Sequence, residues 1–226
     1  MIKHIAVIAL AFAPAVFAQT YIVPEDDCGA TTLHVTRGTD FPNLGEKIGA
    51  DRVKDAYLFL KKRRVAIQPA PSLDFKADVT TDDGVAMAAV ELMPTISGNE
   101  TRTEHAKALI FCGSTPEADW QRETGLGVEI YPQSWNGARP HLKQGDTMWF
   151  IAVDKAAGKL LRDVPMELYR AGAGRIAVGV PNKTGGMSFS YPEPGRYMIL
   201  TNYRRPDPQN PAQWLVDTST LTFEIK

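Results

Sequence analysis

Short segments in which apolar and polar residues alternate recur along most of the chain, and this pattern constrains the fold most. Leu33 and Val35 alternate with polar neighbours, and Phe75, Ala77 and Val79 repeat the pattern further on. Alternation with period two places apolar side chains on one face of a β-strand and polar side chains on the other. These segments therefore predict strands with one face on a core and one face in water.

Two segments are almost entirely apolar instead of alternating. They are Val85–Met93 and Met148–Val153. A strand has this composition when other layers cover both of its faces. We therefore expect both segments to be central strands.

The second half of the chain contains further short strand patterns separated by turn signals. The clearest signals are Pro181-Asn182, Gly185-Gly186 and Pro194-Gly195. Short strands at this spacing are typical of antiparallel sandwiches. The sequence therefore predicts an all-β protein.

One stretch fits two structures. In Asp51–Arg64, Val53, Ala56, Tyr57 and Leu60 have helical spacing, and Asp51 is a suitable N-cap. The intervening Leu58-Phe59 is also apolar, so the same stretch fits a strand. Periodicity leaves both interpretations open.

Glycine and polar residues interrupt the apolar pattern between Gly113 and Gly127. Composition of this kind marks the linkers between domains. We therefore predict an N-terminal β domain over residues 19–115 and a C-terminal β-sandwich over residues 124–226.

The first residues have the features of a secretory signal peptide. Lys3 precedes the apolar run from Ile5 to Phe17, and small residues precede a cleavage point between Ala18 and Gln19. The run is shorter than the roughly 20 residues that a helix needs to cross a bilayer, and no later segment is as apolar. We expect a periplasmic or secreted protein without a transmembrane segment in the mature chain.

Charge and composition exclude several classes of protein. Lys and Arg total 25 and Asp and Glu total 26, so no net positive field attracts nucleic acid. With 44% hydrophobic and 23% charged residues, the chain is not collagen, coiled coil or disordered.

Two cysteines, Cys28 and Cys112, remain after the leader. In an oxidising compartment they can form a disulfide that closes a long loop. The alternative is a pair of separate buried thiols.

Several short, turn-like segments, spread over nearly the whole mature chain, resemble a family of secreted bacterial proteins, the domain-of-unknown-function family 4198. The segments are Tyr21-Ile22-Val23-Pro24, Gly38–Pro42, Ala106-Lys107-Ala108, Gly127–Pro132, Gln144-Gly145-Asp146, Gly158-Lys159-Leu160, Val164–Leu168, Gly185-Gly186-Met187 and Pro194–Tyr197.

The resemblance implies an all-β periplasmic protein of two β-sandwich domains, with a C-terminal domain that is immunoglobulin-like or prealbumin-like. Some relatives are described as periplasmic components of nickel or cobalt uptake, which implies a metal ion or a membrane transport component as partner. This chain has Gln19-Thr20-Tyr21 where the family places a His before its first strand.

Three histidines remain for such a site: His34, His105 and His141. A transition metal needs imidazole or thiolate ligands that converge at about 2 Å. No two of them have a local metal-binding spacing, so they either meet in space around a nickel or cobalt ion or are solvated. The acidic clusters Glu25-Asp26-Asp27 and Asp82-Asp83 lack the spacing of a calcium loop.

No catalytic motif is present in the sequence, which predicts a protein without enzymatic activity. There is no Gly-x-Ser-x-Gly or His-Glu-x-x-His, and the glycines at Gly172 and Gly174 precede a strand rather than the helix of a phosphate loop.

The basic runs Lys61–Arg64 and Arg204-Arg205 are expected to be solvated hairpin ends.

Trp120 and Trp135 lie in polar segments, where exposed indoles can contact a glycan or a protein partner. Trp149 is expected in the core. The sequence thus predicts an exported binding or accessory protein connected with metal uptake, or alternatively a structural or adhesive surface module that binds proteins or glycans.

Overall fold

A computed structural model describes residues 18–60, 63–67, 74–80, 84–112, 124–135, 143–191 and 193–226, with the side chains of residues 134 and 135 excepted. The strands are β1 (Gln19–Pro24), β2 (Gly29–Gly38), β3 (Glu46–Lys47), β4 (Val53–Leu60), β5 (Arg63–Ala66), β6 (Asp74–Val79), β7 (Val85–Leu92), β8 (Thr95–Ser97), β9 (Glu100–Phe111), β10 (Val128–Trp135), β11 (Thr147–Asp154), β12 (Lys159–Leu160), β13 (Met166–Arg170), β14 (Gly174–Gly179), β15 (Gly186–Ser190), β16 (Gly195–Pro206) and β17 (Trp214–Ile225).

The described residues form an all-β, sandwich-like protein, as the sequence predicted. Its one helical element there is a 3-10 turn at Ala50–Arg52. In the described part of Asp51–Arg64 the predicted α-helix is absent, because β4 follows this turn directly and β5 begins at Arg63. Ala56 and Leu58 face one core and Phe59 faces another. Leu58 and Phe59, which did not fit the helical spacing, are therefore apolar because both faces of this strand are covered.

Nine strands of the described chain form a central sheet in the order β14-β13-β16-β17-β9-β7-β4-β5, with β8 paired to β9. The pairing of β17 with β9 is parallel, and the other pairings in this sheet are antiparallel. β9 precedes the predicted domain boundary and β17 follows it. The predicted domains, residues 19–115 and 124–226, thus contribute strands to one sheet.

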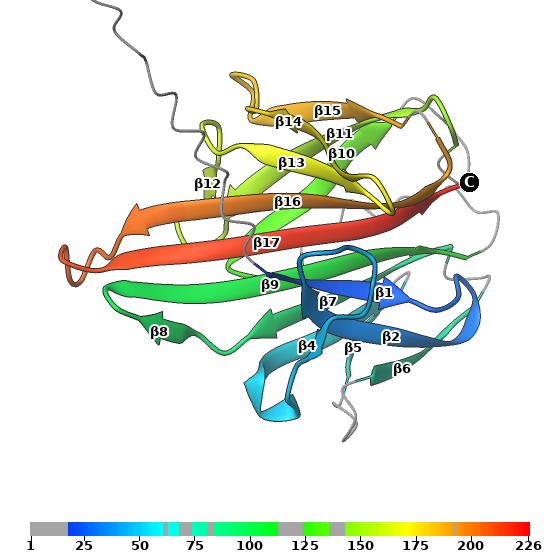
Figure 1. The fold of residues 1–226 in the computed structure, drawn as a ribbon, viewed down its shortest axis with the longest axis horizontal. Helices are drawn as coiled ribbons and strands as arrows, with labels where there is room; N and C mark the ends of the chain where they lie inside the picture. The colour runs from blue at the N-terminus through cyan, green and yellow to red at the C-terminus, as the bar shows by residue number, and fades with distance from the viewer. Residues whose placement is uncertain are drawn as a thin grey trace, which may run out of the picture.

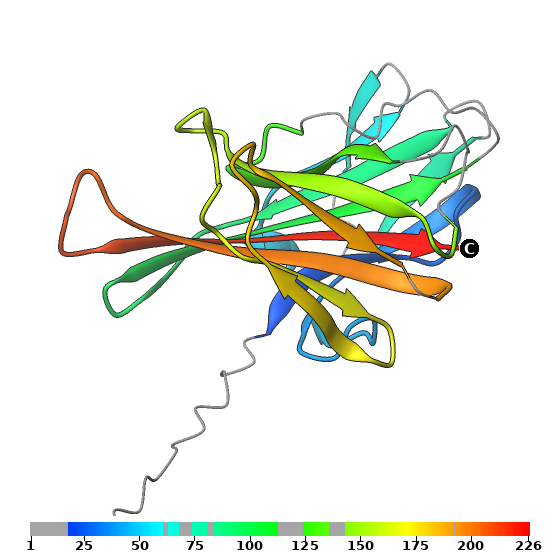
Figure 2. The same ribbon diagram turned by 90° about the horizontal axis from the view of Figure 1, so that it is seen from above.

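Two smaller sheets cover the central sheet on opposite faces (Figures 1 and 2). One, the N-terminal sheet, contains β1, β2, β3 and β6, and the other, the second sheet, contains β10, β11, β12 and β15. Along β7, Val85 and Met87 face the core shared with the second sheet, whereas Ala86 and Ala88 face the core shared with the N-terminal sheet. This two-sided burial explains why the β7 sequence is apolar at almost every position.

The other segment expected to be central, Met148–Val153, forms β11 in an outer sheet. Met148 and Phe150 are fully buried, but the side chain between them, Trp149, is 39% exposed. The expectation that Trp149 belongs to the core is therefore wrong. The second sheet packs on the central sheet with one face, and Trp149 lies on its other face.

A disulfide joins Cys28, at the start of β2, to Cys112, after β9. Their Cα atoms are 5.0 Å apart and the residues are separated by 84 positions. Closing a loop of this length in the unfolded chain stabilises the fold by about 4–5 kcal/mol in the chain-entropy account. The bond connects the N-terminal sheet to the central sheet.

The first strand lies against the last one. Thr220 donates a hydrogen bond to the carbonyl of Thr20 (2.7 Å), and Thr222 donates one to the carbonyl of Ile22 (2.6 Å). Tyr21 and Val23 then pack in a small core with Phe41. β1 is thereby fixed on the face of the central sheet, and its start borders the groove described next.

Candidate ligand-binding groove

A groove of about 540 Å³ lies on the face of the central sheet that carries the N-terminal sheet. Its floor comes from β9, β17, β16, β13 and β14, and one wall comes from Gln19, Arg37 and Thr39. The volume is within the range of about 300–1,000 Å³ that is common for ligand sites. The groove is therefore the candidate functional site.

Strand register brings the groove residues together from distant parts of the sequence. Arg102 on β9 is opposite Val216 on β17, which is opposite Arg204 on β16. In the next exposed row, Glu104 is opposite Thr218, which donates a hydrogen bond to Asn202 (2.8 Å). Paired residues share one face of a sheet, so these side chains form two adjacent rows.

Ion pairs organise the charged side chains. Glu100 accepts hydrogen bonds from Arg102 and from Arg204 Nε (3.2 Å). Glu104 lies 3.2 Å from Arg37 and accepts a hydrogen bond from the backbone N–H of Thr20 (3.1 Å). Each carboxylate therefore has a fixed partner.

At the β13–β14 end of the groove, Glu167 accepts hydrogen bonds from Tyr169 (2.7 Å) and Arg175 (3.1 Å). Burial, reinforced by Glu167, raises the pKa of Tyr169 to about 12. Tyr169 therefore stays protonated at neutral pH. Its hydroxyl remains a hydrogen-bond donor.

The acidic and basic side chains of the groove differ in how much of their surface is exposed. The three carboxylate side chains, Glu100, Glu104 and Glu167, are 14–23% exposed. The four arginine side chains, Arg37, Arg102, Arg175 and Arg204, are 37–48% exposed. The carboxylates thus lie at the base of the groove, and the guanidinium groups lie above them with part of their surface in solvent.

Trp214 supports one of these arginines. The guanidinium carbon of Arg204 lies 3.7 Å from the centre of the Trp214 ring. Stacking of this kind is attractive and restricts the orientation of the guanidinium plane. Arg204 is therefore held on one face by an indole and at Nε by Glu100.

Sequence reasoning did not identify this groove. It treated Arg204-Arg205 as one solvated pair, whereas Arg204 contacts Glu100 and Arg205 contacts Asp217. A signal was present in Glu100-Thr101-Arg102-Thr103-Glu104, because alternate charges along a strand indicate a polar face. The partners on β2 and β16 could not be read from that segment alone.

The structure places His34 between two carboxylates. Its Nδ1 lies 2.8 Å from Asp74, and its Nε2 lies 3.1 Å from Glu25. The hydrogen bond from Thr32, followed by that from His34, lowers the pKa of Glu25. Both ring nitrogens of His34 are thus engaged by protein oxygen atoms.

His105 is buried, with 1% of its surface exposed. Its Nε2 lies 3.1 Å from Asp217, and its Nδ1 lies 3.6 Å from Glu91. Burial opposes a charge on this ring, but Asp217 and Glu91 outweigh that effect and raise the pKa of His105. The adjacent His105 in turn lowers the pKa of Glu91 to about 2, with a further contribution from Lys54.

Lys54 bonds to Glu91 (2.5 Å) and Arg205 bonds to Asp217 (2.5 Å), which extends this cluster to both sides of His105. Both ring nitrogens of His105 thus lie beside carboxylate oxygens of the protein. The arrangement is an ionic network around the buried His105 that joins β4, β7, β9, β16 and β17.

His141 lies outside the described residues, and so does Trp120. Trp135 ends β10, and its side chain is also outside them. Among the described residues, no group of three or more His, Cys, Asp or Glu is arranged to hold a metal ion. The nickel or cobalt site formed by His34, His105 and His141 remains a prediction.

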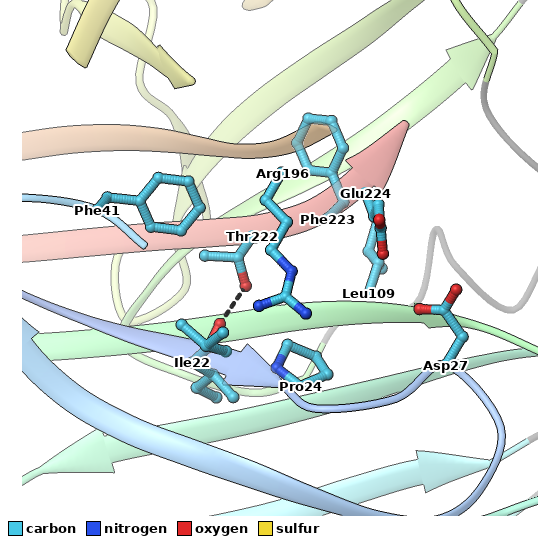
Figure 3. A pocket seen from close by; sticks show the side chains of 10 residues that line it. Ile22, Pro24, Asp27, Phe41, Leu109, Arg196, Thr222, Phe223 and Glu224 are labelled. Atoms are coloured by element: carbon cyan, nitrogen blue, oxygen red, sulfur yellow. Dashed lines mark hydrogen bonds between the residues drawn. The ribbon is translucent and has the colours of Figure 1, made fainter. Parts of the chain in front are cut away.

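A second cavity lies where β1 meets β16, β17 and β9 (Figure 3). Ile22, Pro24, Arg196 and Thr222 are among the residues that line it, and its volume is about 20 Å³. A cavity of this size has room for about one water molecule. It is too small for an organic ligand.

No protein-family model matches the sequence, and no curated protein matches it. One solved structure that resembles the chain comes from work titled "Structural insight into host cell surface retention of a 1.5-MDa bacterial ice-binding adhesin". The match has 11% sequence identity and a TM-score of 0.28, and it covers 93% of this chain and 66% of the other. Within the part of the chain that the structure describes, no helix is long and apolar enough to cross a membrane.

Proposed function

We propose that this chain is an exported, non-enzymatic binding protein that holds a glycan in the groove. The observation that supports the proposal is the set of half-exposed arginines paired with less exposed carboxylates on an open sheet face. A sugar hydroxyl donates one hydrogen bond and accepts others. The groove offers guanidinium donors together with acceptors such as Asn202 and the carboxylate of Glu167.

The shape of the groove favours an extended ligand. It crosses five neighbouring strands, from β9 to β14, and four spacings of about 4.8 Å give a length of about 19 Å. Because the groove crosses the strands, the floor along β9, β17, β16 and β13 presents side chains, and only its β14 end reaches an edge of the sheet. A peptide that adds a strand needs such an edge, so a side-chain-recognised oligosaccharide fits better.

The electrostatics favour binding over hydrolysis. A glycoside hydrolase needs one carboxylic acid whose pKa is raised, so that it can protonate the leaving group. The hydrogen bond from Arg102 instead lowers the pKa of Glu100. Glu104 and Glu167 are likewise paired with arginines.

The charge balance also disfavours nucleic acid as the ligand. The whole chain has a formal net charge of −1, and three carboxylates lie in the groove. A nucleic-acid strand carries one phosphate per about 3.4 Å and would meet these carboxylates repeatedly. A glycan with few charges avoids that repulsion.

A glycan array probed with the purified protein tests the proposal. We expect selective retention of particular oligosaccharides, and we expect the variant Arg175→Ala/Asn202→Ala to lose at least tenfold in affinity for them, as the loss of two polar contacts predicts. Both residues lie in the groove. Arg63→Ala, at the opposite edge of the central sheet on β5, is the matched control. Retention of no glycan, or equal binding by the groove variant, would refute the proposal.

A further inference from the structure

We infer that a second copy of this chain pairs antiparallel with the outer edge of β14, so that the central sheets of two copies form one continuous sheet. The surface consists of Ile176, Val178 and Val180 together with the outward backbone groups of β14, and it is here named the β14 edge. This inference goes beyond the proposed function and does not depend on the ligand of the groove.

The backbone of β14 is paired on one side. β14 pairs with β13, and in the part of the chain that the structure describes no strand pairs with its other side. Figure 2 shows the hairpin of β13 and β14, in yellow, at the periphery of the molecule. An end strand of this kind presents a row of N–H and C=O groups that can bond to another strand.

The exposed side chains of the β14 edge are apolar. Ile176 is 39% exposed, Val178 is 53% exposed and Val180 is 60% exposed. They alternate with small residues such as Ala177, which packs against the core, so the three apolar side chains share one face of the strand. Val178 is opposite the groove residue Glu167, so this face is the groove face of the sheet. A partner on this edge gains the burial of three β-branched side chains.

The two ends of the central sheet differ in their protection against such pairing. The opposite end strand, β5, exposes Arg63 and Arg64, and charged side chains on an edge oppose pairing with another strand. β14 contains one charged residue, Arg175, whose guanidinium donates a hydrogen bond to Glu167 of the neighbouring strand. Of these two ends, the β14 edge is therefore the one suited to pairing.

The β14 edge is complementary to itself. In an antiparallel pair centred on Val178, this residue meets Val178 of the second copy, and Ile176 meets Val180. In the same register, the small residues Ala177 and Gly179 meet on the other face. No charged residue lies between positions 176 and 180, so no like charges are brought together. A second copy thus matches every exposed side chain of this edge with an apolar one.

The size of the contact predicts a reversible dimer. The register of β14 with β13 is regular from Ala177 to Gly179 and shifts at Ile176, so the pairing involves few residues of each copy. Stable interfaces use about 20–30 residues a side. We therefore expect a Kd of roughly 10 to 500 µM. Because both copies use the same edge, the assembly closes at two copies.

The dimer would present both grooves on one side. Residues opposite each other in neighbouring strands share a face, so antiparallel pairing keeps the groove faces of the two copies aligned. Each groove reaches β14 at Gly174 and Arg175. Two sites on one face can hold two parts of one extended ligand, which raises the apparent affinity without any new contact.

Sedimentation velocity of the purified protein between about 1 and 500 µM tests the inference. We expect the sedimentation coefficient to rise with concentration from that of a monomer toward that of a dimer. Val178→Lys places like charges opposite each other and should weaken the dimer at least tenfold. The matched control is Val65→Lys, because Val65 is 40% exposed on the other end strand. The control should leave the dimer unchanged, and near-ultraviolet circular dichroism checks the fold of each variant.

Cysteine variants test the register independently. Opposite residues of antiparallel strands have Cα atoms about 4.5–5.5 Å apart, a separation that a disulfide can bridge. Val178→Cys should therefore form a disulfide-linked dimer, whereas Val65→Cys should remain monomeric on a non-reducing gel. Ile176→Cys and Val180→Cys should give a linked dimer when the two proteins are mixed and little when each is alone.

A monomer at every concentration would overturn the inference. So would a dimer that Val178→Lys and Val65→Lys weaken equally, equal cross-linking of Val178→Cys and Val65→Cys, or a monomer that takes up an extended foreign peptide at this edge. These outcomes leave the proposed function untouched, because the glycan array decides it separately through Arg175 and Asn202.

Discussion

The buried ion pair between Lys107 on β9 and Glu129 on β10 allows a quantitative test of how the central sheet is held to the second sheet. Both side chains are 0% exposed, and Lys107 Nζ lies 3.3 Å from Glu129 Oε2. At an effective dielectric constant of about 20, charges at this separation attract by about 5 kcal/mol. Replacing Lys107 with Met keeps the volume but leaves the carboxylate without this partner.

Glu129 retains some compensation in that variant. It also accepts backbone hydrogen bonds from Thr124 (2.9 Å) and Gly125 (2.5 Å). We therefore expect Lys107→Met to lower the free energy of unfolding by about 3–5 kcal/mol, the usual cost of breaking a buried pair on one side. For a domain of this size that corresponds to a fall in Tm of roughly 6 to 20 °C.

Calorimetry or urea unfolding measures the change, with Lys47→Met on the exposed strand β3 as the control. The control should remain within about 0.5 kcal/mol of the unchanged protein. Removing both charges with Lys107→Met/Glu129→Gln should restore part of the loss, because no unpaired buried charge remains. A fall of less than 2 °C for Lys107→Met would show that the pair is not buried as described.

Three further outcomes follow from the structure. The raised pKa of His105 stabilises the fold fully below the unfolded pKa of about 6.5, and this contribution disappears as the pH rises through the higher folded pKa. In urea unfolding from pH 6 to 9, the excess free energy of unfolding over the variant His105→Gln should therefore shrink. An excess that grows with pH would contradict the assignment. The lowered pKa of Glu91, about 2, acts in the opposite direction. The excess free energy of unfolding over Glu91→Gln should be present above about pH 4.5 and decline toward pH 2. A difference between the two proteins that stays constant over this pH range would refute the prediction. Thiol titration in denaturant without reductant should detect no free thiol from Cys28 and Cys112, and Cys28→Ser/Cys112→Ser should lose about 4–5 kcal/mol in urea unfolding; two titratable thiols would contradict the disulfide.

The alternation of apolar residues predicted the strands well, because a sheet that buries one face requires an apolar residue at every second position of each strand. Phe75, Ala77 and Val79 are all buried on β6, as their spacing indicated. The continuous apolar run of β7 correctly indicated a strand covered on both faces. The similar run of β11 was misleading, because β11 is apolar on both faces although only one face is covered. Composition alone does not show that the face carrying Trp149 is an outer one.

Register was the information that the sequence did not contain. Arg102 and Arg204 become neighbours of one carboxylate only because β9 and β16 both pair with β17. Likewise, the sequence left His105 as either a metal ligand or a solvated residue, and only the pairing of β9 with β7 and β17 places Glu91 and Asp217 beside it. Local patterns specify which residues face a layer, whereas contacts between distant strands decide which polar groups meet.

The parallel pairing of β9 with β17 has a consequence for how the chain acquires its structure. β9 finds this neighbour in Trp214–Ile225, a segment much later in the sequence. Contacts so distant in sequence slow folding because a long loop must close first. Truncation within β17 would therefore expose the apolar cores that pack on both of its faces and make the shortened polypeptide prone to aggregation and proteolysis.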